Sequence, residues 1–262
     1  MTDPAPLSQR ASRLIERLKT RKGRIREGLV LVEGIRATLT AIDGGAAIRF
    51  AVTSPRINER ADGAELAARL RALHVDVRQI ADEELARLSD TEHPQGALMV
   101  CEERTTTLDA LPVGRWLVLD AVQDPGNAGA LLRAAAAFGV DGVVALDGTV
   151  DLWSPKAVRA SAGLAFHVPV ARAPASSLLA RCARTGIAIL VADAAGEDVR
   201  VVERPEAFAL VMGNEGSGVR TVVMEAADQR VAVPMQGEAE SLNVGTAGSI
   251  LLYALMGEKR LG

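Results

Sequence analysis

The fold of this chain is most constrained by short apolar runs that alternate with helical segments from about residue 116 onward. The runs are continuously apolar, whereas a strand with one solvated face alternates apolar and polar residues. Continuous runs are typical of parallel sheets that carry helices on both faces. The predicted strands are Trp116–Val122, Gly142–Leu146, Val168–Ala171, Ile187–Ala192, Ala207–Met212 and Val231–Val233, and the predicted helices are Asn127–Phe138, Ser154–Phe166, Ser176–Thr185 and Leu242–Met256. We therefore expect a parallel-sheet α/β domain in this half of the chain.

A second, smaller α/β region precedes that domain. Its predicted strands are Leu29–Val32, Ile48–Thr53, Val75–Ile80 and Gly96–Glu102, and its predicted helices are Arg36–Ile42, Ala64–Leu73 and Asp82–Leu88. This alternation predicts a layered domain of about a hundred residues. A polar, threonine-rich stretch that contains proline follows it, as is typical of a linker. We assign residues 1–103 to an N-terminal domain, 104–114 to the linker and 115–262 to a C-terminal domain.

The beginning of the chain is basic, although the whole chain is not. The formal net charge is -3, which by itself argues against a nucleic-acid partner. Between Arg10 and Arg36, however, nine basic residues stand against three acidic ones. The arginines that recur there at helical spacing are Arg10, Arg13, Arg17, Arg21 and Arg24. They predict a helix whose basic face follows RNA phosphates, with Arg13, Arg17, Arg21 and Arg24 as RNA-binding residues; the alternative is an ordinary solvated face.

Composition and absent motifs disfavour several classes of protein. The two cysteines, Cys101 and Cys182, form neither a disulfide framework nor a metal-ligand spacing. No apolar run approaches membrane-spanning length, so we expect no membrane segment. Because the cysteines show no disulfide framework and no metal-ligand spacing, we expect a cytoplasmic protein without a bound metal. No G-x-G-x-x-G fingerprint follows the strand that ends at Val122, and no Walker or G-x-S-x-G motif occurs. Dinucleotide enzymes, nucleoside triphosphatases and serine hydrolases are therefore disfavoured.

Three segments rich in Gly, Asn and Ser mark the candidate site: Leu119–Arg133, Leu210–Val219 and Glu240–Tyr253. The last segment follows an apolar run that a proline ends, and Ser241 or Asn243 is placed to cap its helix. Gly245 and Gly248 inside that helix cost about 1 kcal/mol each relative to alanine. Such a cost is tolerated where another backbone or a ligand must come close.

In this order the three segments resemble the three motifs of the SpoU (TrmH-like) branch of the SPOUT class of RNA methyltransferases. The resemblance is close from Trp116 to the C-terminus. It is looser in the N-terminal region, where Leu29–Gly34 and His93–Gly96 resemble parts of an L30e/L7Ae-like substrate-binding domain. It implies a trefoil knot in the C-terminal domain, which would cup a bent S-adenosylmethionine.

The resemblance also implies an activity and a cofactor site. The activity is methylation of a ribose 2′-hydroxyl with S-adenosylmethionine, in ribosomal RNA (23S) rather than transfer RNA. Backbone groups at Gly213, Val233 and Leu242 are expected to hold the adenosine part of the cofactor. Glycine permits close approach, and backbone amides can pair with adenine edges without special side chains.

The expected catalytic residues are Asn127, Arg133, Glu215, Ser241 and Asn243. The resemblance places Arg133 opposite the target nucleotide. Because a guanidinium stays protonated, we expect Arg133 to bind phosphate and stabilise the developing alkoxide. Asn127 and Asn243 would orient these groups, Glu215 would fix Arg133 or accept the proton, and Ser241 would support its loop. The alternatives are a surface arginine for Arg133 and a helix-start carboxylate for Glu215.

Other functions and the oligomeric state remain open at this point. A transfer RNA methyltransferase, a non-catalytic RNA-binding or ribosome assembly factor, and a small-molecule or protein methyltransferase are the alternatives. We also expect a homodimer through the C-terminal domain. Its last helix carries a patch of small residues, Gly245, Gly248 and Ser249, and more apolar residues than one core-facing stripe requires.

Overall fold

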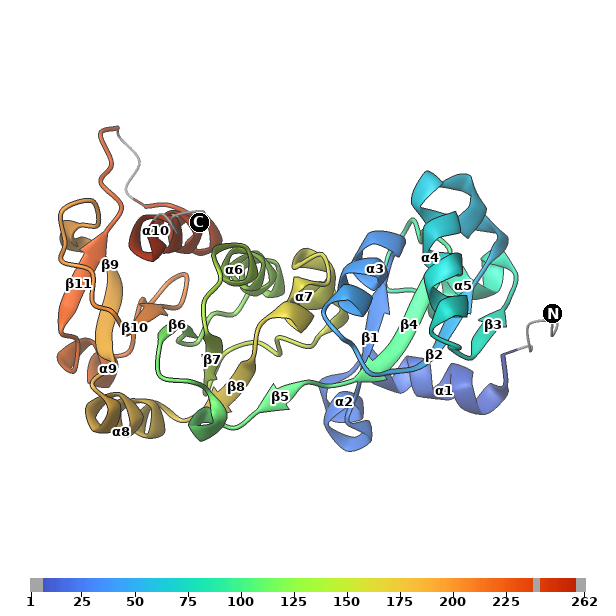
Figure 1. The fold of residues 1–262 in the computed structure, drawn as a ribbon, viewed down its shortest axis with the longest axis horizontal. Helices are drawn as coiled ribbons and strands as arrows, with labels where there is room; N and C mark the ends of the chain where they lie inside the picture. Colours follow the sequence, from blue (N-terminus) through green and yellow to red (C-terminus); the bar gives the residue numbers. More distant parts are fainter. Residues whose placement is uncertain (1–6, 238–240, 258–262) are drawn as a thin grey trace. The chain divides into compact units, whose positions relative to one another are not determined.

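The computed structural model describes residues 7–237 and 241–257, so Glu240 of the third motif segment lies outside it. The chain forms two compact units (Figure 1). The first unit consists of residues 1–104 together with 153–167, and the second consists of residues 105–152 and 168–262.

The first unit is a four-stranded mixed sheet between two helical layers. Its strands are β1 (Leu29–Glu33), β2 (Ile48–Thr53), β3 (Val77–Gln79) and β4 (Ala97–Glu102), in the order β1-β4-β2-β3. Its helices before residue 104 are α1 (Gln9–Leu18), α2 (Arg21–Glu27), α3 (Ile35–Asp43), α4 (Ala61–Ala72) and α5 (Asp82–Leu88). Successive residues of β2 point to opposite faces, so Phe50 packs with α1 and α5 while Ala51 packs with α3 and α4.

The segment from residue 153 to 167 packs on this first unit, although the sequence predicts one helix there within the C-terminal domain. Helix α7 (Pro155–Ala160) packs against β1, and a short 3-10 turn, Leu164–His167, packs against α3. The single predicted helix is wrong because the backbone enters the left-handed region at Ala162 (φ 53°) and Gly163 (φ 85°). A side chain at Gly163 would overlap the carbonyl oxygen of Ala37.

The predicted basic helix is also two helices, so the prediction of one continuous basic face is wrong. Thr20 separates α1 from α2, because its hydroxyl accepts a hydrogen bond from the Gly23 amide and caps α2. Arg24 is buried, and its Nη1 donates to the carbonyls of Leu18 (2.8 Å) and Lys19 (3.0 Å) at the end of α1. Arg24 therefore closes α1 and is not available to RNA phosphates.

The second unit is a seven-stranded parallel sheet in the order β11-β9-β10-β6-β7-β8-β5. The strands are β5 (Thr105–Thr106), β6 (Arg115–Leu119), β7 (Gly142–Leu146), β8 (Val170–Ala173), β9 (Ala188–Asp198), β10 (Phe208–Met212) and β11 (Gln229–Ala232). The predicted parallel-sheet α/β fold is therefore confirmed. Residues 104–114 contribute edge strand β5 and two core residues, Leu108 and Leu111, and so are more than a linker.

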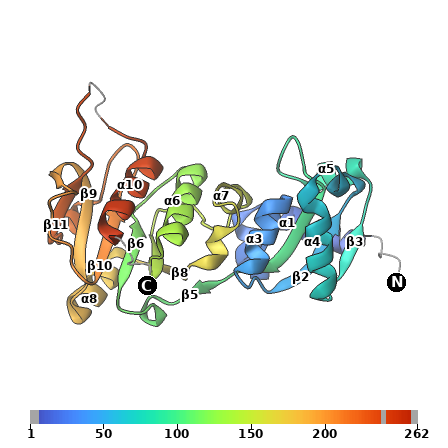
Figure 2. The same cartoon turned by 45° about the horizontal axis from the view of Figure 1, so that its top comes forward.

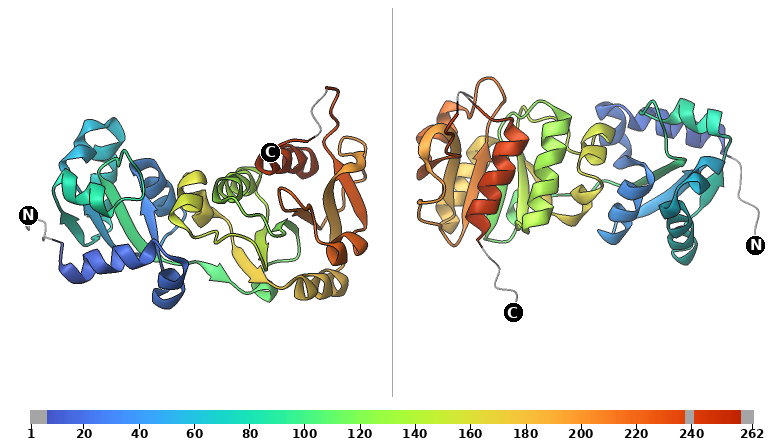
Figure 3. Two further views of the ribbon diagram at one scale, coloured as in Figure 1. Left: turned by 180° about the vertical axis from the view of Figure 1, so that it is seen from behind. Right: turned by 90° about the horizontal axis from the view of Figure 1, so that it is seen from above.

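Helices cover both faces of this parallel sheet. They are α6 (Pro125–Phe138), α8 (Ala175–Thr185), α9 (Thr221–Glu225) and α10 (Val244–Met256). Helices α6 and α10 lie side by side on one face, opposite α8 (Figure 2, Figure 3). Within residues 7–237 and 241–257, no helix is both long and apolar enough to cross a membrane.

Candidate functional site

A cavity at one edge of the parallel sheet is lined by the loops after β10 and β11, by α10 and by residues 192–194 of β9. The loop after β6 lies at the same edge, because the carboxyl ends of parallel strands meet there. The cavity has a volume of about 620 Å³. Its lining includes all three predicted cofactor-binding positions, Gly213, Val233 and Leu242, and three of the predicted catalytic residues, Glu215, Ser241 and Asn243.

A chain of hydrogen bonds joins the three motif segments beside this cavity. Asn243 Nδ2 donates to Asn127 Oδ1 (2.8 Å), and Asn127 Nδ2 donates to Glu215 Oε1 (2.9 Å). The backbone amides of Gln123 and Asp124 also donate to the Glu215 carboxylate, at 3.1 Å each. Three of the predicted catalytic residues are thus brought into direct contact.

Helix starts hold the two asparagines of this chain in place. Asp124 Oδ1 accepts from the Asn127 amide (2.9 Å), and Pro125 occupies the first turn, so α6 begins at a fixed point. Asn243 Oδ1 accepts from the amides of Gly245 (2.9 Å) and Thr246 (3.3 Å) and caps α10. Of the two predicted caps, Ser241 and Asn243, the structure uses Asn243. Its amide group is left free to reach Asn127.

Glycine at position 213 lets the loop after β10 fold back on itself. A Cβ atom at Gly213 would lie 2.4 Å from the Gly218 carbonyl carbon and from the Val219 nitrogen. Gly218 itself has a φ of 70°, in the left-handed region that favours glycine. The close approach expected at Gly213 is therefore to the backbone of its own loop, on the wall of the cavity.

The charge of Glu215 follows from its partners. Burial raises the pKa of this carboxyl group, but the hydrogen bonds from the Asn127 side chain and from the backbone amides outweigh burial. The pKa of Glu215 is therefore lowered from its ordinary value of 4.5. Glu215 is an anion at neutral pH and a weaker base than an ordinary glutamate.

Arg133 lies on α6, six residues beyond Asn127, which is about 9 Å along the helix axis. Its side chain is exposed. The predicted contact between Arg133 and Glu215 is not present, because the partners of Glu215 within the described residues are Asn127 and the two backbone amides. The alternative of a helix-start carboxylate is closer to the structure, because the Glu215 carboxylate accepts from two amides just before the start of α6.

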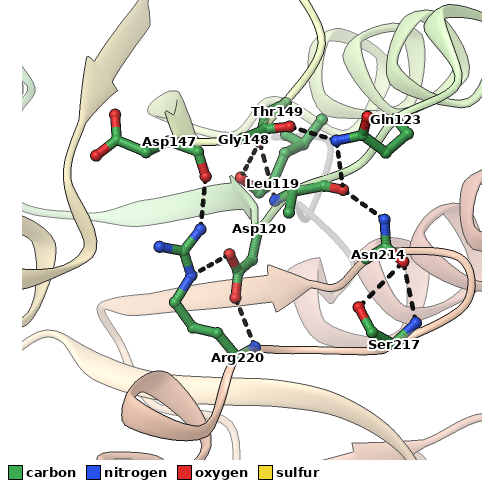
Figure 4. Close-up of polar contacts among 10 residues, drawn as sticks. Leu119, Asp120, Gln123, Asp147, Gly148, Thr149, Asn214, Ser217 and Arg220 are labelled. Atoms are coloured by element: carbon green, nitrogen blue, oxygen red, sulfur yellow. Dashed lines mark hydrogen bonds and ion pairs between the residues drawn. The ribbon is translucent and has the colours of Figure 1, made fainter.

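Several polar residues around the site were not predicted from the sequence. Asp193 lines the cavity, and Asp120 is buried with 1% of its surface exposed. The Asp120 carboxylate accepts from Arg220 Nε (2.5 Å) and from the Arg220 amide (2.8 Å), and Arg220 Nη2 donates to the Asp147 carbonyl (2.6 Å; Figure 4). Asp120 and Asp193 each follow an apolar run directly, and this position at the end of an apolar run is the signal that could have identified them.

The described residues contain no group of three or more His, Cys, Asp and Glu side chains placed to hold a metal ion. The lining of the cavity instead combines apolar side chains with two carboxylates, Asp193 and Glu215.

Two known families match this chain. Residues 114–253 match the SpoU rRNA Methylase family, and residues 13–99 match the MRM3-like substrate binding domain. A similar curated protein is the 23S rRNA (guanosine(2553)-2'-O)-methyltransferase RlmP of Bacillus subtilis (strain 168), with 32% identity over 206 residues. The alignment covers 77% of this chain and 78% of that one.

Solved structures of similar proteins share the whole fold. The AdoMet-bound rRNA methyltransferase from Sinorhizobium meliloti is 28% identical, with a TM-score of 0.81 over 96% of this chain and 95% of that one. The SpoU methyltransferase AviRb from Streptomyces viridochromogenes is 27% identical, with a TM-score of 0.81 over 95% and 96%. On these matches, this chain belongs to the SpoU rRNA methylase family.

Proposed function

We propose that this chain transfers a methyl group from S-adenosylmethionine to a ribose 2′-hydroxyl of 23S ribosomal RNA. One observation carries the proposal: Glu215 and Asn243 line the cavity and also contact Asn127 outside its lining. A place for a cofactor therefore adjoins polar side chains that can orient a second substrate. Methyl transfer of this kind depends mainly on such positioning.

The cavity fits the cofactor in size and in chemistry. Sites for ligands of this size enclose about 300 to 1,000 Å³ and have mostly apolar walls with a few polar groups, as the cavity here does. Met212, Val231 and Leu251 offer apolar contacts. The carboxylates of Asp193 and Glu215 complement a positive charge. Gly213, Val233 and Leu242 would hold the adenosine part.

The cofactor supplies an activated methyl group, and the chain's residues place the ribose hydroxyl in line with it. Arg133 binds phosphate near the target and stabilises the developing alkoxide, because a guanidinium keeps its charge. Asn127 and Asn243 orient the target. Glu215 serves as the anchor of Asn127, since a carboxyl with a lowered pKa is poorly matched to accept a proton at neutral pH. Ser241 supports the third loop.

The substrate proposal rests on the N-terminal region and on the relatives. The MRM3-like match spans residues 13–99, and the Bacillus subtilis relative is named for 23S rRNA. Arg13, Arg17 and Arg21 are exposed on α1 and α2, which supports them as RNA-binding residues. The L30e-like character of this unit and the trefoil knot of the other remain predictions from the resemblance.

We also propose a cytoplasmic homodimer that pairs through α10. The patch of small residues on α10 does not serve this purpose, because Gly245 and Gly248 pack against Ala130 and Leu131 of α6 in the same chain. Farther along α10, Tyr253 is 72% exposed, although its ring lies 5.9 Å from the Phe138 ring of α6. Ile250, one turn earlier, is 39% exposed. Apolar side chains this exposed on a helix favour a partner surface.

Calorimetry and methyl transfer together test the proposed function. The protein should bind S-adenosylmethionine in the presence of a chelator, and S-adenosylhomocysteine should compete. Arg133→Ala should abolish labelled methyl transfer to 23S rRNA and change cofactor affinity by no more than about threefold. Arg184→Ala, at an exposed position of α8, is the matched control. Transfer only to tRNA would favour the transfer RNA alternative, and RNA binding without transfer would favour the non-catalytic one.

A further inference from the structure

The loop formed by residues 213–220 is attached to the loop after β6 through three residues, Arg220, Asn214 and Glu215. At its end, Arg220 pairs with the buried Asp120. At its start, Asn214 Nδ2 donates to the Ala121 carbonyl at 2.8 Å (Figure 4). The second attachment lies on the cavity, because Asn214 is one of the lining residues.

Asn214 uses each of its polar groups. Its backbone amide and carbonyl pair with those of Gly218, both at 3.0 Å. Its Oδ1 accepts from the amides of Gly216 (2.9 Å) and Ser217 (3.0 Å) and from the Ser217 hydroxyl (3.1 Å). One end of the side chain therefore closes the 213–220 loop, and the other end ties this loop to Ala121.

Ala121, whose carbonyl accepts the hydrogen bond from Asn214, has an unusual backbone conformation. Ala121 has a φ of 57°, which costs energy for a residue with a Cβ atom and persists only where surrounding contacts hold it. Its amide donates to Thr149 Oγ1 (3.1 Å), and its carbonyl also accepts from Gln123 Nε2 (3.4 Å). Thr149 Oγ1 donates in turn to the Leu119 carbonyl (2.7 Å). The Ala121 carbonyl is thus a fixed point.

We propose that Asn214 is a positioning residue for methyl transfer. Its side-chain amide fixes the 213–220 loop relative to the residues that precede α6, and so sets the spacing between the cavity and Asn127. The neighbouring Glu215 takes its hydrogen bonds from Gln123 and Asp124, so any slip between the two loops also disturbs the contact to Asn127. This inference rests on the proposed function.

Asn214→Asp removes the hydrogen bond to the Ala121 carbonyl and keeps the hydrogen bonds that close the 213–220 loop. The aspartate keeps the Oδ1 acceptor for Gly216 and Ser217 but places an oxygen, in place of a donor, against the Ala121 carbonyl. A displacement of about 1 Å can lower the rate of a positioned reaction about 100-fold. We therefore expect the single-turnover rate at saturating cofactor and RNA to fall by roughly 30- to 100-fold, with the Kd for S-adenosylmethionine changed by less than about threefold.

The test compares wild type, Asn214→Asp, the neutral Asn214→Ser and the control Ser217→Ala. Ser217→Ala removes one hydrogen bond to Asn214 Oδ1 and leaves the bond from Asn214 to Ala121. The rate of this variant should therefore stay within about threefold of wild type. The substrate is large ribosomal subunits, or their extracted 23S rRNA, from cells that lack this protein. Rates come from labelled S-adenosylmethionine, Kd values from calorimetry and folding from thermal unfolding.

Each outcome decides the inference. A rate loss without a matching loss of cofactor affinity in Asn214→Asp, or in Asn214→Ser should the aspartate variant not fold, supports it. A loss smaller than about tenfold, or one matched by weaker cofactor binding, overturns it. An equal loss of rate in Ser217→Ala also overturns the inference. The rate would then depend on closure of the 213–220 loop and not on the hydrogen bond from Asn214 to Ala121. If wild type transfers no methyl group to any of these RNAs, the proposed function itself fails.

Discussion

Glu215 shows how the surroundings of one carboxylate decide its use. Its partners are the side-chain amide of Asn127 and the backbone amides of Gln123 and Asp124. Each of these donors favours the ionised form, and together they outweigh the effect of burial on the pKa. The group is therefore suited to anchoring Asn127 across the pH range in which the enzyme would work.

The lowered pKa of Glu215 predicts how stability depends on pH. The stabilisation from these hydrogen bonds is fully present above the ordinary pKa of 4.5 and is lost as the pH falls through the lower folded value. Wild type should unfold at a higher temperature than Glu215→Gln at about pH 7, and the difference should shrink below pH 4.5. Thermal unfolding over this range measures it, with exposed Glu203→Gln as control. A difference that stays constant on acidification would contradict the assignment.

The structure brings three of the expected catalytic residues into contact, through hydrogen bonds that the sequence did not predict. Asn127 lies 88 residues from Glu215 and 116 residues from Asn243. Only the likeness of their segments to known motifs indicated that these residues meet. The donors to Glu215 include backbone amides whose direction depends on loop conformation, which no side-chain pattern encodes. Arg24 was assigned to RNA because helical spacing cannot reveal that α1 ends at Leu18 and needs a donor there.

At the scale of helices, the contact between α6 and α10 explains the two glycines of α10. A Cβ atom at Gly245 would lie 3.1 Å from the Ala130 Cβ atom, and one at Gly248 would lie 2.3 Å from Leu131 Cδ2. The glycines therefore let two helices approach closely within one chain. Because α6 begins next to Asn127 and α10 begins at Asn243, this packing also fixes the two asparagines against each other.

Gly248→Ala should destabilise the protein by about 1 to 2 kcal/mol. Overpacking a core costs about 1 to 3 kcal/mol, and the better helix propensity of alanine offsets up to about 1 kcal/mol of it. Thr246→Ala, at an exposed position of α10, should stay within about 0.5 kcal/mol of wild type. Denaturant unfolding measures both variants. A Gly248→Ala protein as stable as wild type would mean that α6 and α10 are not in contact as described.

Helices α1 and α2 predict the salt dependence of RNA binding. Each lost phosphate contact lowers the slope of log affinity against log salt by about one unit. Changing Arg13, Arg17 and Arg21 to glutamine should lower it by about two units, because Arg17 is already paired with Glu27 at 2.9 Å. The same change at Arg60, Arg69 and Arg71, around α4, is the control. If both triple variants keep the wild-type slope, the basic surface is an ordinary solvated face.

Elements were predictable where local signals decide them. The run Gly142–Leu146 forms β7 within its predicted bounds, and Asp82–Leu88 forms α5. The segment from residue 154 to 166 was not, because its helix stops where tertiary contacts with α3 hold Gly163 in a left-handed conformation. Helix α9 was missed because a five-residue helix shows too little periodicity to be detected.

For the whole molecule, we propose a dimer seam on α10 that includes the exposed Tyr253. Tyr253→Arg should convert dimers to monomers without unfolding them, because this side chain is 72% exposed. Leu252 is a poor choice for this test, since it is fully buried. Light scattering at micromolar concentration measures the change, with Leu73→Arg in the other unit as control. A wild-type monomer with full methyl transfer would reject the dimer.

The proposed activity is a ribose methylation in 23S rRNA that depends on this site. Its most direct test is a map of 2′-O-methylation across ribosomal RNA from cells with the protein, without it, and with Arg133→Ala in its place. We expect a methylated ribose in 23S rRNA that is present with wild type and missing in both other maps. Three identical maps would contradict it.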